Sequence, residues 1–261
     1  MGIERLGPRQ IARMRAAGRA AAETLALVGS RLRPGISTAD VDRWVREDTA
    51  RRGARPSQLG YRGFPAAVCT SRNDVACHGI PSERERLEPG DVVSIDVTSE
   101  LDGWHGDNCA TFVIGEASPE ARHVVEVARR CRDAGIALLR DGVRLGDVGA
   151  VIEALARREG CGIVREVGGH GIGRAMHLAP HVEHYGAPGR GLRLRAGMAI
   201  TIEPIVTLGE PGVVQDADGW TLRTADGTPA AQFEHTVLVT REGCEILTQL
   251  DADRLAVRPL P

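Results

Sequence analysis

The residues best suited to chemistry in this chain are histidines gathered in one segment. Residues 165–186 read REVGGHGIGRAMHLAPHVEHYG and hold four of the eight histidines. His177 and His181 have the i, i+4 spacing of a zinc-binding helix, but Pro180 stands between them and no H-E-x-x-H motif is present. A helical zinc site is therefore not expected. The glycines beside His170 allow close approach to a metal ion, so we expect His170 to be the single imidazole ligand of a metal site.

Acidic residues in apolar surroundings supply the other candidate ligands. They are Asp96, Asp107, Glu203 and Glu234, and each is expected at the start or end of an apolar strand. Burying an unpaired acid is costly, and carboxylates on adjacent strands repel each other. A cation between them removes both penalties, so the acids predict a metal site. Two divalent ions would neutralise four carboxylates. This ligand set suits Co, Mn or Fe, with Zn also possible, and a pair of such ions is a common arrangement for activating water.

Two further histidines each begin an H-x-x-P element, His78 in CHGIP and His177 in MHLAP. We expect these two side chains to act as donors to a substrate. The remaining histidines are expected to be structural or exposed: His105, His123, His181, His184 and His235.

Capping residues and periodicity predict the helices that would position these groups. Residues 8–30 are rich in Ala and Arg and predict a helix, and Ser37 can cap a second one. Ser118–Pro119 begins a third predicted helix that runs to about residue 140. A fourth predicted helix ends at Gly160.

Alternation of apolar and polar residues predicts the strands. Val93, Ile95 and Val97 would share one face of a strand, and Asp96 would lie on the other. A turn near Leu101–Asp102 would bring the chain back along residues 108–114, with Asp107 at the start of the returning strand. The segments MAITIEPIV and AQFEHTVLVT are expected to be the corresponding strands of the second half.

Two parts of the chain resemble each other at an offset of 107 residues. Residues 31–53 match residues 138–160 at seven positions. At the same offset Asp96 falls on Glu203, one carboxylate on another. The order helix, helix, strands therefore occurs twice. This order predicts a duplicated unit and an α+β fold, a mostly antiparallel sheet with helices packed on one side.

The composition excludes several functions. The 261 residues carry a net charge of −2 with a pI near 6.5, which is not the charge of a nucleic-acid-binding protein. The chain has no lysine, which excludes a P-loop, a kinase lysine and a Schiff base. The glycines at 169, 171 and 173 do not complete a dinucleotide-binding motif. The Arg-rich first 55 residues are expected to be a solvated helix face rather than a polyanion site.

Targeting signals are also absent from the sequence pattern. No apolar run approaches the ~20 residues of a membrane span, and the N-terminus lacks the apolar core of a signal peptide. The six cysteines show no C-x-x-C pairing, so we expect neither a zinc knuckle nor a disulfide framework. A cytoplasmic location is the resulting expectation.

The longest motifs resemble those of the pita-bread metallopeptidases, and the sequence is similar to the type I methionine aminopeptidases of that family (M24). The matching segments are GYRGFPAAVCTSRNDVACHGIP, IDVTSELDGWHGDNCATF, GHGIGRAMHLAPHVEHYG, TIEPIV and DGWTLRTADGTPAAQFEHTVLVT. The resemblance implies a single catalytic pita-bread domain over residues 1–261, with internal halves at roughly 8–115 and 116–250. It implies a curved sheet with helices on its outer face. It also implies removal of the initiator methionine from nascent proteins and peptides whose second residue is small.

The resemblance further implies a role for each site residue. Two metal ions would be bound by Asp96, Asp107, His170, Glu203 and Glu234. Asp107 and Glu234 would bridge the ions, and Glu203 would also accept a proton. His78 would contact the scissile amide, and His177 would stabilise the tetrahedral oxyanion. The methionine pocket would be lined by Tyr61, Phe64, Cys69 and Trp220, because apolar, aromatic and soft walls suit a thioether.

The chain departs from the family pattern at two positions of the pocket region. Met176 stands where many relatives have Phe, and Gln58 where some bacterial relatives have Cys. Both concern side-chain selectivity rather than metal chemistry. The short interval between Glu203 and Glu234 leaves no room for the insertion of type II enzymes. The resemblance implies nascent chains or short peptides as substrates, a transient ribosome contact and a monomer, without a nucleic-acid or membrane partner.

Two alternative functions are compatible with the same sequence motifs. A proline-specific peptidase of the same fold, an aminopeptidase P or a prolidase, would share the five ligands but usually carries an additional N-terminal domain. A non-catalytic binding protein on this fold would have lost ligands, whereas this chain keeps all five.

Overall fold

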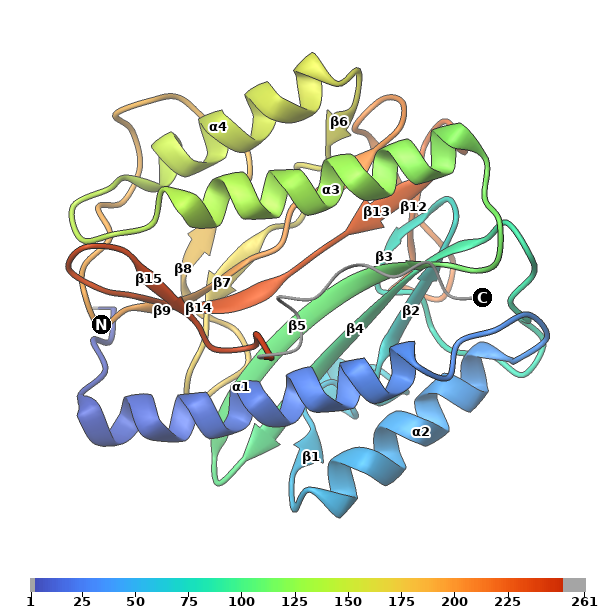
Figure 1. Ribbon diagram of the computed structural model, residues 1–261, viewed down its shortest axis with the longest axis horizontal. Coiled ribbons are helices and arrows are strands. Elements are labelled where there is room, and N and C mark those ends of the chain that lie inside the picture. The colour runs from blue at the N-terminus through green and yellow to red at the C-terminus, as the bar shows by residue number, and fades with distance from the viewer. Residues whose placement is uncertain (1–2, 251–261) are drawn as a thin grey trace.

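The computed structural model describes residues 3–250. The helices of this part are α1 (Pro8–Gly29), α2 (Thr38–Arg51), α3 (Pro119–Ala137) and α4 (Leu145–Arg158), with a 3-10 turn at Tyr61–Gly63. Figure 1 shows α1 and α2 along one side of the molecule and α3 and α4 along the other, both pairs lying across the near face of the strands. The predicted α+β fold, with helices on one face of antiparallel strands, is confirmed.

The helix starts follow the predicted caps. Ser37 accepts a hydrogen bond from the amide of Asp40, and Ser118 accepts one from the amide of Ala121. Pro119 occupies the first turn of α3, where its missing N–H costs nothing. Helix α3 ends a few residues before the expected boundary, and the chain then turns through Gly142, whose φ is +91°.

All pairings between the described strands are antiparallel. The first half contains β1 (Arg55–Pro56), β2 (Cys69–Arg72), β3 (Val75–Cys77), β4 (Val92–Leu101) and β5 (Trp104–Val113). The second half contains β6 (Gly162–Ile163), β7 (Gly169–Gly171), β8 (Leu178–Val182), β9 (Ala199–Ile202), β10 (Ile205–Thr207), β11 (Val213–Gln215), β12 (Leu222–Thr224), β13 (Ala230–Gln232), β14 (His235–Val239) and β15 (Cys244–Ile246). Strand β5 pairs with β4 along its whole length, and β1 and β2 pair with separate parts of β4. A five-stranded sheet of the second half runs β15-β14-β9-β7-β8.

The hairpin of β4 and β5 corrects one expectation. Its turn is the two-residue Asp102–Gly103, in which both residues have positive φ, as a tight hairpin turn requires. Pairing therefore continues to the last residues before the turn, and β5 begins at Trp104 rather than near residue 108. Asp96 and Asp107 lie inside long strands, so the expectation of acids at strand ends is wrong for both of them.

The strands of the second half break at the predicted acids. MAITIEPIV forms two strands, β9 and β10, separated by Glu203 and Pro204, and AQFEHTVLVT forms β13 and β14, separated by Phe233 and Glu234. The expectation of continuous strands is wrong here. Pro204 cannot donate to a strand ladder, which accounts for the first break. Each break leaves a glutamate between two short strands. Its side chain is therefore not bound to the alternation between the two faces of a sheet that a regular strand imposes.

Backbone contacts support the proposed duplication at an offset of 107 residues. Gly35 N donates to Leu87 O, and Gly142 N donates to Leu194 O. The same offset relates two isolated strand bridges, Ser37 with Arg86 and Arg144 with Arg193. Each half thus ties the loop before its second helix to the segment before its central strands. That the halves form one catalytic domain stays a proposal.

Apolar side chains from helices and strands fill a core under each helix pair. One cluster joins α3 and α4 to the strands of the second half, and includes Val127, Ile152, Ile200 and Val237. Another joins α1 and α2 to β4. The strands are thereby fixed from the helical side, so their opposite face is available for the polar residues of the site.

Helix α1 approaches β5 closely because both carry glycine at the contact. A Cβ on Gly106 would lie 2.4 Å from Gly18 Cα. We expect Gly106→Ala to lower the free energy of unfolding by about 1–3 kcal/mol, measured by urea denaturation of the metal-free protein. Gly243→Ala is the matched control, since a Cβ there meets nothing within 4 Å. Equal stability of the two variants would contradict this account of the packing.

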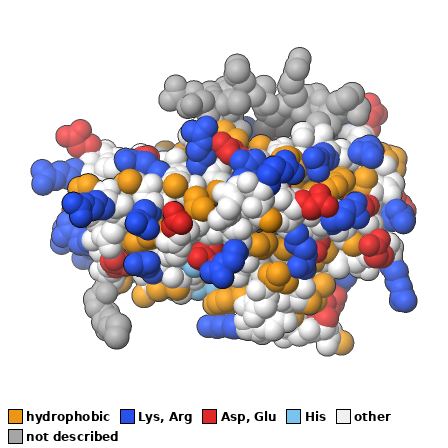
Figure 2. Space-filling model, turned by 90° about the horizontal axis from the view of Figure 1, so that it is seen from below, with side chains coloured by type: hydrophobic (Ala, Val, Ile, Leu, Met, Phe, Trp, Pro, Cys, Tyr) orange, Lys and Arg blue, Asp and Glu red, His pale blue; other side chains and the backbone are white. Residues whose placement is uncertain are grey.

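The Arg-rich N-terminal segment carries ion pairs along its helices. Arg19 pairs with Glu23, Arg46 with Asp42, and Arg52 with the buried Asp48. Figure 2 shows basic and acidic side chains interspersed over the face that α1 and α2 present. This mixture fits the predicted solvated helix face. Within residues 3–250, no helix is both long and apolar enough to cross a membrane.

Candidate metal centre

A pocket of about 420 Å³ collects the predicted site residues from both halves of the chain. Its walls include every residue that the sequence singled out as ligand, catalytic group or pocket lining: Tyr61, Phe64, Cys69, His78, Asp96, Asp107, His170, His177, Glu203, Trp220 and Glu234. These residues span more than 170 positions of the chain, so the fold brings them together.

The five candidate ligands come from five different segments. Asp96 lies in β4 and Asp107 opposite Thr98 in β5, whereas His170 lies in the short strand β7. Glu203 and Glu234 occupy the two strand breaks described above. Ligand atoms of Asp107, His170 and Glu234 all lie within 4.8 Å of one another, a spacing that one metal ion could bridge. The other two acids line the same pocket.

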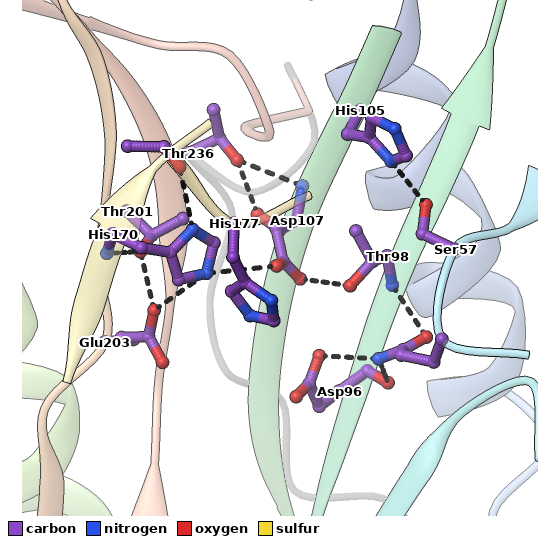
Figure 3. Close-up of polar contacts among 12 residues, drawn as sticks. Ser57, Asp96, Thr98, His105, Asp107, His170, His177, Thr201, Glu203 and Thr236 are labelled. Atoms are coloured by element: carbon purple, nitrogen blue, oxygen red, sulfur yellow. Dashed lines mark hydrogen bonds and ion pairs between the residues drawn. The ribbon is translucent and has the colours of Figure 1, made fainter. Parts of the chain in front are cut away.

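His170 presents a free nitrogen to the carboxylates. Its Nδ1 lies 3.0 Å from the carbonyl oxygen of Gly171, which a ring N–H can reach as donor. This leaves the Nε2 lone pair 3.5 Å from Glu203 Oε1 and 3.7 Å from Asp107 Oδ2 (Figure 3). Burial lowers the pKa of His170 to about 3, so the ring is neutral at pH 7. A neutral imidazole held by a carbonyl through its other nitrogen is the usual state of a metal ligand.

The four carboxyl groups are buried together without a compensating cation in the described chain. Burial raises the pKa of Asp107 to about 7 and that of Glu203 to about 8. Burial, followed by repulsion from neighbouring acids, raises the pKa of Asp96 and of Glu234 well above the usual range. Glu234 Oε1 is buried with no hydrogen-bond partner. An oxygen-rich set with an orphaned carboxylate oxygen fits a divalent metal, which would satisfy that oxygen and offset the repulsion.

Hydroxyl and amide groups that the sequence analysis did not single out hold the acids in place. Thr98 Oγ1 donates to Asp107 Oδ1 at 2.7 Å, and Thr201 Oγ1 donates to Glu203 Oε1. Thr236 Oγ1 accepts from the amide of Asp107, which ties β14 to β5 across the two halves. Strand alternation could have revealed Thr98 and Thr201, because each lies two residues from an acid.

His177 and His78 lie on the open side of the acids. The Nδ1 atom of His177 is 2.8 Å from the Tyr61 hydroxyl, and its ring centroid is 4.2 Å from that of His170. Burial, and then the nearby His78 and Arg62, lower the pKa of His177 to about 4. Burial also lowers the pKa of His78, so both rings are neutral donors at pH 7. The backbone of His78 lies in the left-handed region with φ of 56°. A non-glycine residue in this region is uncommon, and such residues are concentrated at functional sites.

The end of the pocket beyond His78 is apolar. Phe64 packs edge-on against Trp220 with centroids 5.2 Å apart, and Trp220 also meets the ring of His78. Cys69 belongs to the same apolar cluster, and Met176 brings a flexible thioether to the pocket lining. Of the predicted methionine-pocket residues, Phe64, Cys69 and Trp220 lie in this apolar cluster. Tyr61 instead contacts His177.

The remaining histidines behave mostly as expected. His105, His123 and His235 hydrogen-bond to Ser57 Oγ, to the carbonyl of Glu159 and to Thr248 Oγ1 respectively. His184 is buried, and its Nε2 accepts from the amide of Glu203 at 3.0 Å, which supports the break between β9 and β10. His181 is exposed but lines the pocket.

Burial of these acids predicts a pH-dependent stability for the metal-free protein. The folded chain keeps protons on Asp107 and Glu203 at pH values where the unfolded chain has released them, so stability falls as pH rises through about 7 and 8. The buried histidines, whose pKa is lowered, act oppositely but only below their unfolded pKa of about 6.5. Between about pH 6.5 and 8.5 we therefore expect the unfolding free energy to fall by about 1–3 kcal/mol. Thermal melts in chelator test this, and a melting temperature that rises over the range would contradict it.

Comparison with known proteins identifies the family of this chain. Residues 12–241 match metallopeptidase family M24. The chain is 44% identical to methionine aminopeptidase A of Synechocystis sp. over 94% of its own length and 97% of the relative. The crystal structure of methionine aminopeptidase from Thermotoga maritima matches with a TM-score of 0.94 at 38% identity, covering 95% of this chain and 100% of that chain. The chain therefore belongs to the methionine aminopeptidases of family M24.

A more distant likeness defines the fold alone. The prolidase from Pyrococcus furiosus matches with a TM-score of 0.76 at 20% identity. The match covers 95% of this chain but 66% of the prolidase. The pita-bread fold is thus shared with proline-specific peptidases that are longer than this chain.

Proposed function

We propose that this protein hydrolyses the N-terminal methionine from nascent proteins and peptides whose second residue is small. The observation that supports it most is the junction of two environments in one pocket. A buried set of four carboxylates and one imidazole adjoins a recess walled by Phe64, Cys69 and Trp220. The first environment suits divalent metal ions, and the second suits an unbranched thioether side chain.

Two divalent ions per chain, of Co, Mn, Fe or Zn, are the proposed cofactors. The residues that would hold them are Asp96, Asp107, His170, Glu203 and Glu234. Asp107 and Glu234 lie close to each other and to His170, so these three residues would hold an ion together. When bound, such ions supply Lewis-acid chemistry and lower the pKa of water. The carboxylates in turn would be held ionised, which removes the penalty of their burial.

The chain's own groups would then bind, orient and move protons. Glu203 would accept a proton, as the family resemblance implies, and the hydroxyl of Thr201 orients its carboxylate by donating to Oε1. His78, at the boundary between the acids and the apolar recess, would donate to the scissile amide. His177 would donate to the oxyanion that develops at the oxygen of the scissile carbonyl. It can act as this donor because a Tyr61 hydroxyl that donates to Nδ1 leaves the ring proton on Nε2.

A direct test is turnover of Met-Ala-Ser by the metal-free protein reloaded with one divalent ion at a time. We expect methionine release with at least one of Co, Mn, Fe or Zn, and none with the chelated protein. Calorimetric titration in the same series gives the number of ions bound. Absence of any metal binding would favour the non-catalytic alternative. The cytoplasmic location, monomeric state and ribosome contact stay predictions.

The proline-specific alternative has a separate test. Peptides of the Xaa-Pro type are compared with Met-Ala-Ser at the same metal loading. We expect Met-Ala-Ser to be cleaved faster, because the recess is walled by apolar and soft side chains. Faster cleavage of the Xaa-Pro peptides would replace our assignment with the alternative.

A further inference from the structure

The side chain of Gln58 contacts Asp96 from outside the ligand set. Its Nε2 donates to the Asp96 carboxylate oxygen Oδ1 at 3.1 Å and to the Asp96 backbone carbonyl at 2.9 Å. Its Oε1 accepts from the amide of Thr98 at 3.2 Å. Gln58 is 6% exposed and lines the pocket. All polar atoms of the amide are therefore engaged with the strand that carries Asp96.

Two of these contacts have a purely structural use. Strand β1 pairs with β4 through Arg55 and Pro56, and the amide of Ser57 still donates to Thr98 O. The chain then leaves the strand, and the Gln58 amide takes the place of the next peptide group along β4. These contacts satisfy backbone atoms that the strand edge would otherwise leave unpaired.

The contact with Asp96 Oδ1 has no such backbone use. An amide nitrogen carries two hydrogens, so Gln58 can serve the carbonyl and the carboxylate together. Asp96 is buried beside Asp107 and Glu203, whose negative charges repel the negative charge of Asp96. A fixed donor on one oxygen restrains the carboxylate against that repulsion, and it leaves the second oxygen free to bind an ion.

We propose that Gln58 is a positioning residue that fixes the orientation of the Asp96 carboxylate and thereby strengthens the binding of one of two divalent ions. The inference rests on the proposed function, because Asp96 is a ligand only there. Groups that orient metal ligands typically contribute 10–100-fold to metal affinity. Gln58 would act on metal binding through Asp96 rather than as a ligand, which would correct the expectation that this position concerns side-chain selectivity alone.

The test is calorimetric titration of the metal-free protein with Mn²⁺. For Gln58→Met, which keeps the length of the side chain and removes the amide, we expect one of two binding events to weaken by about 10–100-fold. Ser57→Ala is the matched control from the same loop, since its hydroxyl contacts His105 and no carboxylate. The control should keep both affinities.

A second variant and a double variant complete the test. Gln58→Ala leaves room for water at the Thr98 amide, so it provides a folded variant if Gln58→Met is unstable. In an Asp96→Ala background, Gln58→Met should cause no further loss of Mn²⁺ affinity. Wild-type affinities in both Gln58 variants, or a further loss in the double variant, would overturn the inference. Absence of metal binding by the wild-type protein would instead count against the proposed function.

Discussion

Replacement of Asp107 by asparagine is expected to lower the turnover of Met-Ala-Ser by roughly 10³-fold or more, with loss of bound metal. Its carboxylate is a proposed metal ligand and lies within 4.8 Å of ligand atoms of His170 and Glu234. A neutral amide offers one weaker oxygen where two anionic oxygens stood. Loss of the several kcal/mol that bound ions contribute to a transition state corresponds to this factor.

The same substitution should have the opposite effect on the metal-free protein. Because burial raises the pKa of Asp107 to about 7, its ionisation above that pH destabilises the folded state. Asparagine keeps the shape and can still accept from Thr98. We therefore expect the metal-free variant to melt above the metal-free wild type at pH 8. Removal of charge at an exposed carboxylate, Asp133→Asn, is the control and should change neither activity nor melting.

A variant that kept full turnover and bound two ions would contradict the role of Asp107 as a metal ligand. A variant that lost turnover but melted below the wild type in chelator would contradict the electrostatic account of the site. The two measurements therefore test the metal chemistry and the burial energetics separately.

The sequence predicted the helices well because helix starts are determined by capping residues that lie next to them in the sequence. A serine that caps through its side chain, as at Ser37 and Ser118, acts within one turn of its own position. The breaks at Glu203 and Glu234 were not predicted, because β-branched and aromatic residues typical of strands flank both acids in the sequence. What ends β9 is partly Pro204 and partly a hydrogen bond from the amide of Glu203 to His184, a partner supplied by the tertiary fold.

The candidate site likewise has some features that the local sequence predicts and others that only the tertiary fold determines. Residue type and resemblance placed eleven residues that line one pocket, since ligands and catalytic groups are specified by their chemistry. The contacts that orient them were not predicted. Thr236 reaches the backbone of Asp107 over a separation of 129 residues, and Tyr61 reaches His177 over 116. Threonine and tyrosine are common on strands and in pockets, so only the three-dimensional arrangement distinguishes these from others.

Loss of the His177 imidazole is expected to lower kcat by roughly 10²-fold or more, the usual scale for one oxyanion donor. In His177→Ala the metal content should stay unchanged, because the residue is not among the proposed ligands. If the donor acts mainly in the transition state, kcat and kcat/KM should fall by the same factor. Turnover of Met-Ala-Ser with matched metal loading measures both constants. His123→Ala, on the surface of α3, is the control.

The neutral state of His177 makes this prediction specific about pH. Burial and nearby positive groups lower its pKa to about 4, so the ring stays neutral from about pH 5 upward and titrates too low to shape the activity profile near pH 7. The His177→Ala variant should therefore lose activity by a constant factor across pH 6 to 9. Tyr61→Phe should give a smaller loss, because the ring remains but its tautomer is no longer held by the hydroxyl. Full kcat in His177→Ala, or a loss confined to low pH, would show that another group stabilises the oxyanion.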